Sequence, residues 1–191
     1  MNDIVIAGIP EEYNKIKEAT AELHFNMASD LYTGSLLKTL AASRSSGRLL
    51  ELGTGTGLAT AWIAAGMDAD SSLVTVENNE LLIEVARRNI NNDRVEFVLE
   101  DGYEWIKNYS GEKFDFIFAD AMPGKYDLFD ETISILKSGG LYIIDDMLPQ
   151  PNWPVGHDEK AGSFIRRLEQ RSDLLITKLN WSTGIIIVTK K

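Results

Sequence analysis

The 191-residue chain contains no cysteine, which excludes disulfides, a thiolate nucleophile and thiolate-based zinc or iron–sulfur sites. Its longest apolar runs, such as residues 184–188, have the length of a strand and are too short to cross a membrane. The segment Met1–Pro10 carries Asp3 and has no flanking basic residues, so we expect no secretory signal there. Together these absences favour a cytoplasmic location.

Basic residues are also scarce, because 19 Lys and Arg face 29 Asp and Glu and the net charge is −10. Such a field repels nucleic acid and anionic membranes unless a basic patch overrides it. The nearest approach to a patch is Arg166, Arg167 and Arg171, in a segment that also holds Glu159 and Glu169. That mixture is typical of a solvated helix face. We therefore expect a small-molecule partner, and neither nucleic acid nor a membrane.

Hydrophobic residues make up 44% of the chain, which is enough to bury a core. We expect a single domain over residues 1–191, with an N-terminal helical cap over 1–47 and a core over 48–191. In the cap, Pro10 leads into apolar residues with helical spacing, and a second helical pattern runs from about Leu31 to the turn "SRSSG".

Strand-like runs alternate with helical patterns after the cap. The runs cover residues 48–52, 72–77, 95–101, 114–120 and 141–146, and the helical patterns lie near 58–66, 80–90, 102–109 and 126–137. Continuous apolar strands between helices predict a parallel sheet that is covered on both faces.

The end of the chain departs from this alternation. The stretch "LPQPNWPVGH" predicts a long loop, and an amphipathic helix with Ala161, Phe164, Ile165 and Leu168 follows it. The runs "LLITKLN" and "GIIIVTK" are then separated only by "WSTG". Because so short a link cannot make a parallel crossover, these runs predict an antiparallel hairpin.

Three glycines stand where the first strand turns into its helix, in the stretch "RLLELGTGTGLATAW". Missing side chains let a ligand lie against the backbone, and the start of a helix offers free N–H groups. A dinucleotide site requires G-x-G-x-x-G, and counting from either Gly53 or Gly55 puts no glycine at the third position. The spacing is instead G-x-G-x-G up to Gly57, with Glu51 two residues ahead.

This form, E-L-G-T-G-T-G, resembles motif I of class I S-adenosylmethionine (SAM) dependent methyltransferases. The resemblance implies a three-layer, Rossmann-like α/β fold with a mostly parallel seven-stranded sheet of order 3-2-1-4-5-7-6. It also implies that Glu77 binds the ribose hydroxyls, for which a carboxylate is a suitable acceptor, and that Asp101 and Gly102 contact adenine. The cofactor-binding residues implied are Met27, Glu51, Gly53, Thr54, Gly55, Gly57, Glu77, Asn78, Asp101, Gly102 and Asp120.

The segment "FADAMPGKYD" lacks the (N/D)PPY-type motif of amino-group methyltransferases. Over roughly residues 25–146 the chain resembles small-molecule O-methyltransferases of the catechol and caffeoyl-CoA type, including "MASDLYTG", which resembles the segment that folds over the methyl donor. This resemblance implies a homodimer and a divalent cation, Mg²⁺ first, held by Asp120, Asp145 and Asp146. A cation there would orient a phenolic or catechol-like hydroxyl and lower its pKa.

The chain departs from that family at two positions. Pro123 stands in place of the usual lysine, with Lys125 two residues later, and Asp146 stands where Asn is usual. Three alternatives therefore stay open: a cation-assisted O-methyltransferase, a cation-independent enzyme with His157 as the base, and a protein that holds SAM without turnover. The candidate catalytic residues are Asp120, Lys125 and His157. Trp153 is a candidate wall for an aromatic acceptor.

Overall fold

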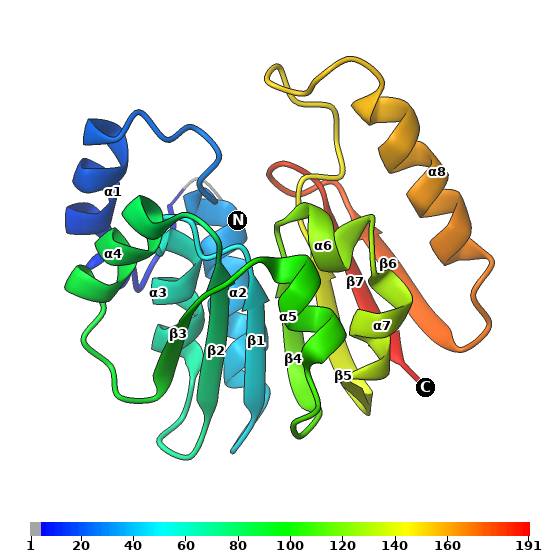
Figure 1. Cartoon of the computed structure of the whole chain (residues 1–191), viewed down its shortest axis with the longest axis horizontal. Helices are drawn as coiled ribbons and strands as arrows, with labels where there is room; N and C mark the ends of the chain where they lie inside the picture. Colours follow the sequence, from blue (N-terminus) through cyan, green and yellow to red (C-terminus); the bar gives the residue numbers. More distant parts are fainter. Residues whose placement is uncertain (1–4) are drawn as a thin grey trace.

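A seven-stranded sheet forms the centre of the computed structural model, which describes residues 5–191 (Figure 1). Residues 1–4 lie outside the described residues. They include Asp3, on which the expectation of no secretory signal depends. The strands are β1 (Arg48–Leu52), β2 (Ser72–Glu77), β3 (Val95–Leu99), β4 (Phe114–Ala119), β5 (Leu136–Ile144), β6 (Leu174–Leu179) and β7 (Ile185–Lys190). The helices are α1 (Tyr13–Glu22), α2 (Leu31–Ala42), α3 (Leu58–Gly66), α4 (Glu80–Asn89), α5 (Gly102–Asn108), α6 (Met122–Lys125), α7 (Phe129–Ser134) and α8 (His157–Glu169).

The predicted sheet order is confirmed as β3-β2-β1-β4-β5-β7-β6. Strands β1 to β5 pair in parallel, whereas β7 runs antiparallel to both β5 and β6, so the predicted hairpin is also confirmed. The strand order reverses between β1 and β4. Ligands of open α/β sheets bind at the carboxyl ends of the strands beside such a reversal.

Helices cover both faces of the sheet, with α5, α6 and α7 in front and α2 and α3 behind in Figure 1. Successive side chains of a strand point to opposite faces, and accordingly Leu49 and Leu50 of β1 belong to two different buried clusters. Leu49 packs with the α1–α4 layer, which includes the buried Trp62, and Leu50 packs with the α5–α8 layer, which includes the buried Phe129. The division into a cap and a core at residue 47 stays a prediction.

Two predicted boundaries are wrong, for local reasons. The strand predicted over 95–101 ends at Leu99, because the Asp101 side chain caps α5 by accepting from the backbone N–H groups of Tyr103 and Glu104. The helix predicted near 126–137 is only α7, because α6 ends at Lys125 and β5 begins at Leu136. Helix α7 does not begin earlier because Leu128, just before it, lies in the left-handed region at φ +56°.

The fourth and fifth strands also differ from prediction at their ends. The run predicted over 114–120 ends at Ala119, and the run predicted over 141–146 spans Leu136 to Ile144. Both strands stop just before their aspartates, so the carboxylates stand on the connections that leave the sheet. That edge of the sheet is therefore where polar side chains can meet.

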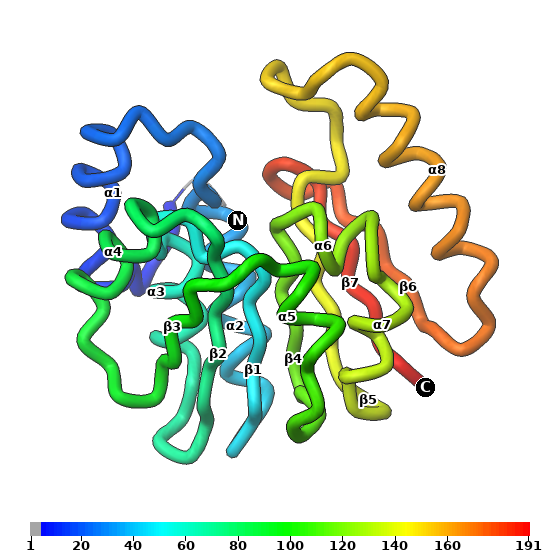
Figure 2. The backbone as a smooth tube through the Cα atoms, viewed as in Figure 1, coloured from blue at the N-terminus to red at the C-terminus, as the bar shows by residue number. Residues whose placement is uncertain are grey.

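The loop after β5 leads directly into α8. In Figure 2 the backbone of this loop extends above the sheet at the upper right of the view, and α1 lies at the upper left. His157, predicted to follow the loop, is the first residue of α8. Within the described residues, none of the helices is long and apolar enough to cross a membrane.

Candidate active site

A cavity of about 750 Å³ lies at the carboxyl ends of the strands. Its wall is made by the segment between α1 and α2, the glycine turn after β1, and the ends of β2, β4 and β5. The loop after β5 and the start of α8 complete it. The volume is within the usual range for a small-molecule site.

Two of the three motif glycines line the cavity, and the third does not. A Cβ on Gly55 would lie 3.1 Å from the ring of Phe25, and one on Gly53 would lie 3.1 Å from the carbonyl oxygen of Asp120. At Gly57 a Cβ would instead lie 2.8 Å from Cβ of Ala86 in α4, so glycine at this position allows the close packing of α4. The predicted closeness of a ligand to the backbone therefore applies to Gly53 and Gly55.

The carboxylate of Glu77 lines the cavity and also holds its floor. One oxygen accepts from the Gly55 N–H at 2.8 Å, and the other accepts from the N–H groups of Asn78 and Asn79 at 3.0 and 2.9 Å. A carboxylate has about four acceptor sites, so roughly one remains for a ligand hydroxyl. In this conformation the Glu77 carboxylate can accept a hydrogen bond from only one of the two ribose hydroxyls that it is predicted to bind.

Glu51 lies beneath the glycine turn and is fully buried. The hydroxyls of Thr60 and Thr75 donate to one of its oxygens at 2.5 and 2.6 Å, while the other oxygen has no partner within residues 5–191. Burial raises the pKa of Glu51 to about 8, and the two threonine hydrogen bonds oppose this. Thr54, whose hydroxyl lies 2.6 Å from that of Thr75, links the buried acid to the cavity.

The remaining predicted cofactor residues divide into two groups. Met27 and Asn78 line the cavity. Asp101 caps α5 and Gly102 packs against Pro123, where a Cβ would lie 2.8 Å from Cγ, and neither is part of the cavity wall. Their predicted contact with adenine stays a prediction.

Several residues of the wall are not among the predicted site residues. Phe25 and Ser29 precede α2 in an irregular segment, and the Ser29 hydroxyl donates to Asp120 at 3.4 Å. Thr183 belongs to the hairpin link "WSTG", and its hydroxyl donates to Asp145 at 2.6 Å. The sequence predicts this hairpin link but not that it reaches the cavity. Only the β5-β7-β6 order brings it to the end of β5.

The three predicted metal ligands lie on the connections after β4 and β5. Burial and then the charge of Asp145 raise the pKa of Asp120 well above its ordinary value, and burial raises the pKa of Asp145 to about 6. Asp145 already accepts from Thr183 and from the backbone N–H of Asp146. Within residues 5–191 no three His, Asp or Glu side chains are grouped to hold a metal. As placed, the three aspartates do not fit a divalent cation.

Lys125 reaches the cavity although its place in the sequence is shifted. Gly124 has φ +85° and leaves no room for a side chain beside Leu52, and this turn directs the next residue inward. Lys125 is only 5% exposed, and its Nζ lies 5.3 Å from the ring centroid of Tyr126. The charge of Lys125 lowers the pKa of both Asp120 and Asp145.

An aromatic wall closes the other side of the cavity. Nε2 of His157 lies 3.1 Å from the hydroxyl of Tyr126, and the imidazole ring lies 4.4 Å from the ring of Trp153. Burial, and then the charge of Lys125, lower the pKa of His157, so the ring is neutral at pH 7. A neutral imidazole beside flat rings can bind a planar ligand and accept its proton. Both His157 and Trp153 line the cavity, and their roles stay predictions.

The sequence matches the model of the O-methyltransferase family over residues 7–190. A catechol O-methyltransferase of Mycobacterium tuberculosis is 30% identical over 120 residues, which cover 60% of this chain and 54% of that protein. A putative O-methyltransferase of Mycobacterium marinum is 27% identical over 117 residues, covering 58% and 52%. The matches span about half the length of these curated relatives.

Solved structures resemble the whole described fold. The O-methyltransferase TomG of Streptomyces achromogenes, in complex with SAM, has a TM-score of 0.83 at 23% identity and covers 98% of this chain and 93% of its own. An O-methyltransferase of Bacillus cereus, in complex with SAH (S-adenosylhomocysteine), has a TM-score of 0.82 at 23% identity, with 98% and 94% covered. These likenesses confirm the predicted fold.

Proposed function

Because the chain belongs to the O-methyltransferase family, we propose that it transfers the methyl group of SAM to a hydroxyl of a small molecule. The acceptor class is phenolic or catechol-like. The observation that carries this proposal is one cavity that joins the glycine turn and Glu77 to the wall of His157 and Trp153. A donor and an acceptor in one cavity can be aligned for direct displacement.

The residues near β1 and β2 fit the methyl donor. Gly53 and Gly55 leave the backbone bare, and Glu77 keeps an acceptor site for a hydroxyl. The acids Glu77, Asp120 and Asp145 line this wall, and a cationic ligand favours their ionised forms. When bound, SAM supplies an electrophilic methyl group.

The residues near β5 and α8 suit an acceptor with a planar ring. Trp153 offers a flat face, and the neutral ring of His157 can take the proton of a hydroxyl that lies in the cavity. The Tyr126 hydroxyl lies at hydrogen-bond distance from His157 and orients it. Since Asp120, Asp145 and Asp146 do not fit a divalent cation as placed, no step is assigned to one.

The test has two stages that use the full chain. Calorimetry should detect binding of both SAM and SAH, and absence of heat with both would end the proposal. The protein is then incubated with SAM and pairs of aromatic acceptors, each phenol matched by its methyl ether. We expect SAH to accumulate only with the free hydroxyl. Tight binding without turnover over a broad panel would instead indicate a protein that holds SAM.

A further inference from the structure

Eight consecutive residues of the cavity wall belong to no helix or strand. Residues 23–30, between α1 and α2, all line the cavity. Within the described chain, residues 26–29 make no backbone–backbone hydrogen bond, and the Ser29 hydroxyl reaches Asp120 only at 3.4 Å. A segment without internal hydrogen bonds keeps one conformation only if its ends are held, because ordering it costs conformational entropy.

The two ends of this segment are held in different ways. At the start, the N–H groups of His24 and Phe25 donate to carbonyls of α1. At the other end, Asp30 caps α2, and one of its carboxylate oxygens accepts from the N–H groups of Tyr32 and Thr33 at 2.8 and 2.9 Å. The second oxygen of Asp30 stays available for another donor.

That donor comes from the hairpin link between β6 and β7, residues 181–184. The Ser182 hydroxyl donates to the second oxygen of Asp30, and the indole N–H of Trp181 donates to the carbonyl of Tyr32 at 3.0 Å. The rings of Trp181 and Tyr32 also pack edge to face, with centroids 5.5 Å apart. Two adjacent residues of the link therefore hold the first turn of α2.

The link is itself fixed against the opposite wall of the cavity. The Thr183 hydroxyl donates to Asp145 at 2.6 Å, and the Thr183 carbonyl accepts from the N–H of Leu148 at 2.8 Å. Gly184 packs so closely on Leu148 that a Cβ would lie 2.6 Å from its backbone nitrogen. A link placed in this way can hold Asp30 in a defined position.

Ser182 has a backbone conformation that glycine would adopt more easily. Its φ is +52°, in the left-handed region, and the neighbouring Gly184 has φ +91°. A non-glycine residue in this region is strained and indicates a task for its side chain. Within residues 5–191 the only hydrogen bond of the Ser182 hydroxyl is the one to Asp30.

We propose that Ser182 is a positioning residue for the methyl donor, because through Asp30 it holds residues 23–30 against the glycine turn. This inference rests on the proposed function. Phe25 marks the contact, since its ring lies 3.1 Å from the position that a Cβ of Gly55 would take. Ser182 is not part of the cavity wall and acts only through Asp30. A looser segment lowers the apparent affinity by the fraction of molecules that are competent to bind.

Calorimetry with SAH on the full chain compares Ser182→Ala with Ser182→Gly. Both variants lack the hydroxyl, but alanine keeps the backbone strain and glycine relieves it, so the glycine variant should be more stable in urea. SAH affinity should nevertheless fall by about tenfold in both. If Ser182 served only the fold, the loss of affinity would follow the loss of stability. Unchanged affinity in both variants, or a loss confined to Ser182→Ala, would overturn the proposal.

Ser46→Gly is the matched control for the backbone. Ser46 has nearly the same conformation, at φ +51°, in an exposed turn between α2 and β1 that is not part of the cavity wall. Its replacement should leave SAH affinity unchanged, and an equal loss in Ser46→Gly and Ser182→Gly would overturn the proposal. In turnover, Ser182→Gly should raise KM for SAM about tenfold and change kcat by less than about twofold. A lower kcat with an unchanged KM would also contradict a positioning role.

Hydrogen–deuterium exchange of the cofactor-free chain tests the same contact without a ligand. The amides of Tyr32 and Thr33, which Asp30 binds, should exchange about tenfold faster in Ser182→Gly than in wild type. Thr183→Val is the control, because this neighbouring hydroxyl binds Asp145 and not Asp30. Equal exchange in wild type and Ser182→Gly, or equal acceleration in both variants, would overturn the proposal.

The exchange rates separate the failure of this inference from the failure of the proposed function. Absence of heat with both SAM and SAH would end the methyltransferase proposal, and the exchange rates would still decide whether Ser182 holds the first turn of α2. Wild-type SAH affinity and exchange in Ser182→Gly would keep the proposed function and reject the role of Ser182.

Discussion

At the residue scale, Gly55 is where the cavity floor has no side chain. Its backbone is left-handed, with φ +53°. Gly139 in β5 is a suitable control, because it is also left-handed, at φ +75°, and no atom lies within 4 Å of the position that a Cβ would take. Valine at either position costs about 1 to 3 kcal/mol of strain. Only Gly55→Val should also weaken SAM binding, by about tenfold or more, as measured by calorimetry. Equal SAM affinity in Gly55→Val and Gly139→Val would place the methyl donor elsewhere.

Glu51 gives a prediction about stability and pH. Its pKa is raised by burial from 4.5 to about 8 in the folded chain, so between these values the folded protein keeps a proton that the unfolded chain releases. The free energy of unfolding therefore falls as pH rises through this window, by up to about 1.4 kcal/mol per pH unit. Glu51→Gln imitates the protonated acid and removes this loss.

Urea unfolding of the cofactor-free protein tests the Glu51 prediction. The variant Glu51→Gln should be more stable than wild type at pH 7, and the difference should shrink toward zero below pH 4.5, where both states of wild type become protonated. A stability difference that is constant with pH would mean that Glu51 is ionised in the folded protein.

His157 gives a prediction about the rate. Burial and Lys125 lower its pKa below 6.5, and the charges of Lys160 lower it further, whereas those of Asp146 and Asp158 raise it. Because the neutral ring is the base, kcat should fall as the pH is lowered, with its inflection below pH 6.5. His157→Gln should lower kcat by about 10² to 10⁴ and remove that inflection from the pH profile. An unchanged profile would assign the base to another group.

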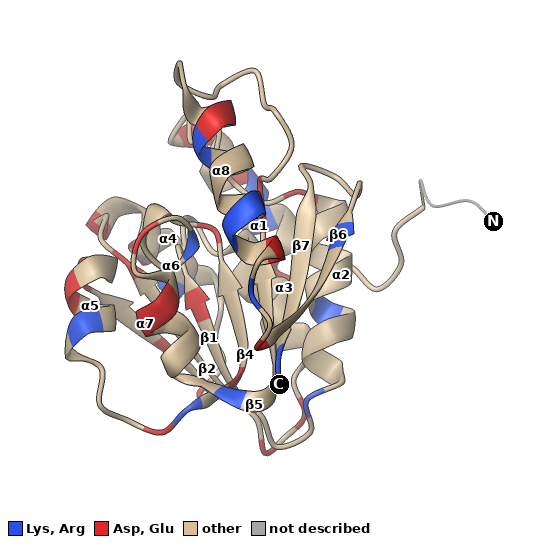
Figure 3. Cartoon of the chain, turned by 90° about the vertical axis from the view of Figure 1, so that its right-hand side faces the viewer, with Lys and Arg blue, Asp and Glu red and all other residues tan. Residues whose placement is uncertain are grey.

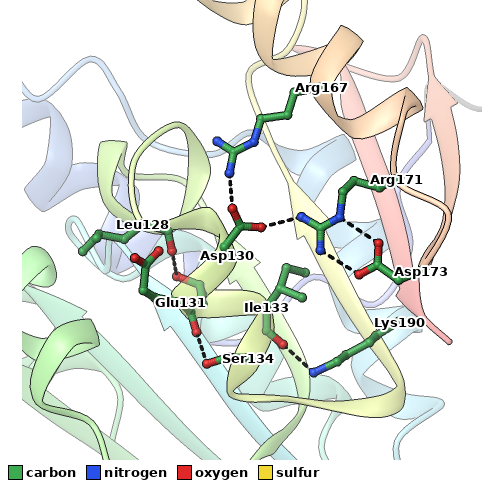
Figure 4. A network of polar contacts seen from close by, with 10 residues as sticks. Leu128, Asp130, Glu131, Ile133, Ser134, Arg167, Arg171, Asp173 and Lys190 are labelled. Carbon is green, nitrogen blue, oxygen red and sulfur yellow. Dashed lines mark hydrogen bonds and ion pairs between the residues drawn. The ribbon is translucent and has the colours of Figure 1, made fainter.

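At the element scale, α8 presents His157 at its start and is tied down near its end. Asp130 at the start of α7 pairs with both Arg167 and Arg171, and Arg171 also pairs with Asp173 at 2.6 Å (Figure 4). Single exposed ion pairs contribute little, and a shared carboxylate that joins two helices contributes more than one pair. The network therefore fixes the helix that carries the proposed base.

Urea unfolding of Asp130→Asn tests this link. The variant should lose about 1 kcal/mol of unfolding free energy, and less of it at high salt, because these charges are exposed to screening. Glu104→Gln is the matched control, since Glu104 also stands in the first turn of a helix but pairs only with Lys107 at 3.0 Å. The control should change stability by at most about 0.5 kcal/mol. Equal losses in the two variants would mean that the network adds nothing beyond one surface pair.

The elements that the sequence predicts best are those with a simple period. Continuous apolar strands and the short "WSTG" link predict a parallel sheet and its hairpin, whereas the strand order was implied only by the family resemblance. The α6–α7 region is predicted worst, since the left-handed Leu128 breaks an apolar pattern that remains helical in the sequence. Tertiary contacts, which no local pattern records, decide the conformation there.

The same difference applies to the site. Gly55 and Glu77 were predictable because a bare backbone and an acid at a strand end are local features. The positions of Thr183 and Lys125 were not, because the first depends on strand order and the second on a turn packed under Tyr142. Sequence spacing alone could not show whether Lys125 reaches the cavity.

At the scale of the whole molecule, the sheet order gathers acids at one edge of an already acidic chain. Figure 3 shows acidic and basic residues interspersed along α8, whereas the cavity is lined by Glu77, Asp120, Asp145 and Asp146 against Lys125. The formal charge of the chain is −10. Both the local and the overall field therefore favour a ligand with more positive charge.

SAM carries one more positive charge than SAH, so the two should respond differently to salt. Raising the ionic strength from about 0.02 to about 0.3 M shortens the range of the acidic field, and SAM affinity should fall by about two- to fivefold. The affinity for SAH should change less, because its net charge is zero. Calorimetry of both ligands at the two salt concentrations measures the ratio directly. If both affinities fell equally, the field of the acidic cavity would not act on the sulfonium, and the placement of the methyl donor beside Asp120 would be wrong.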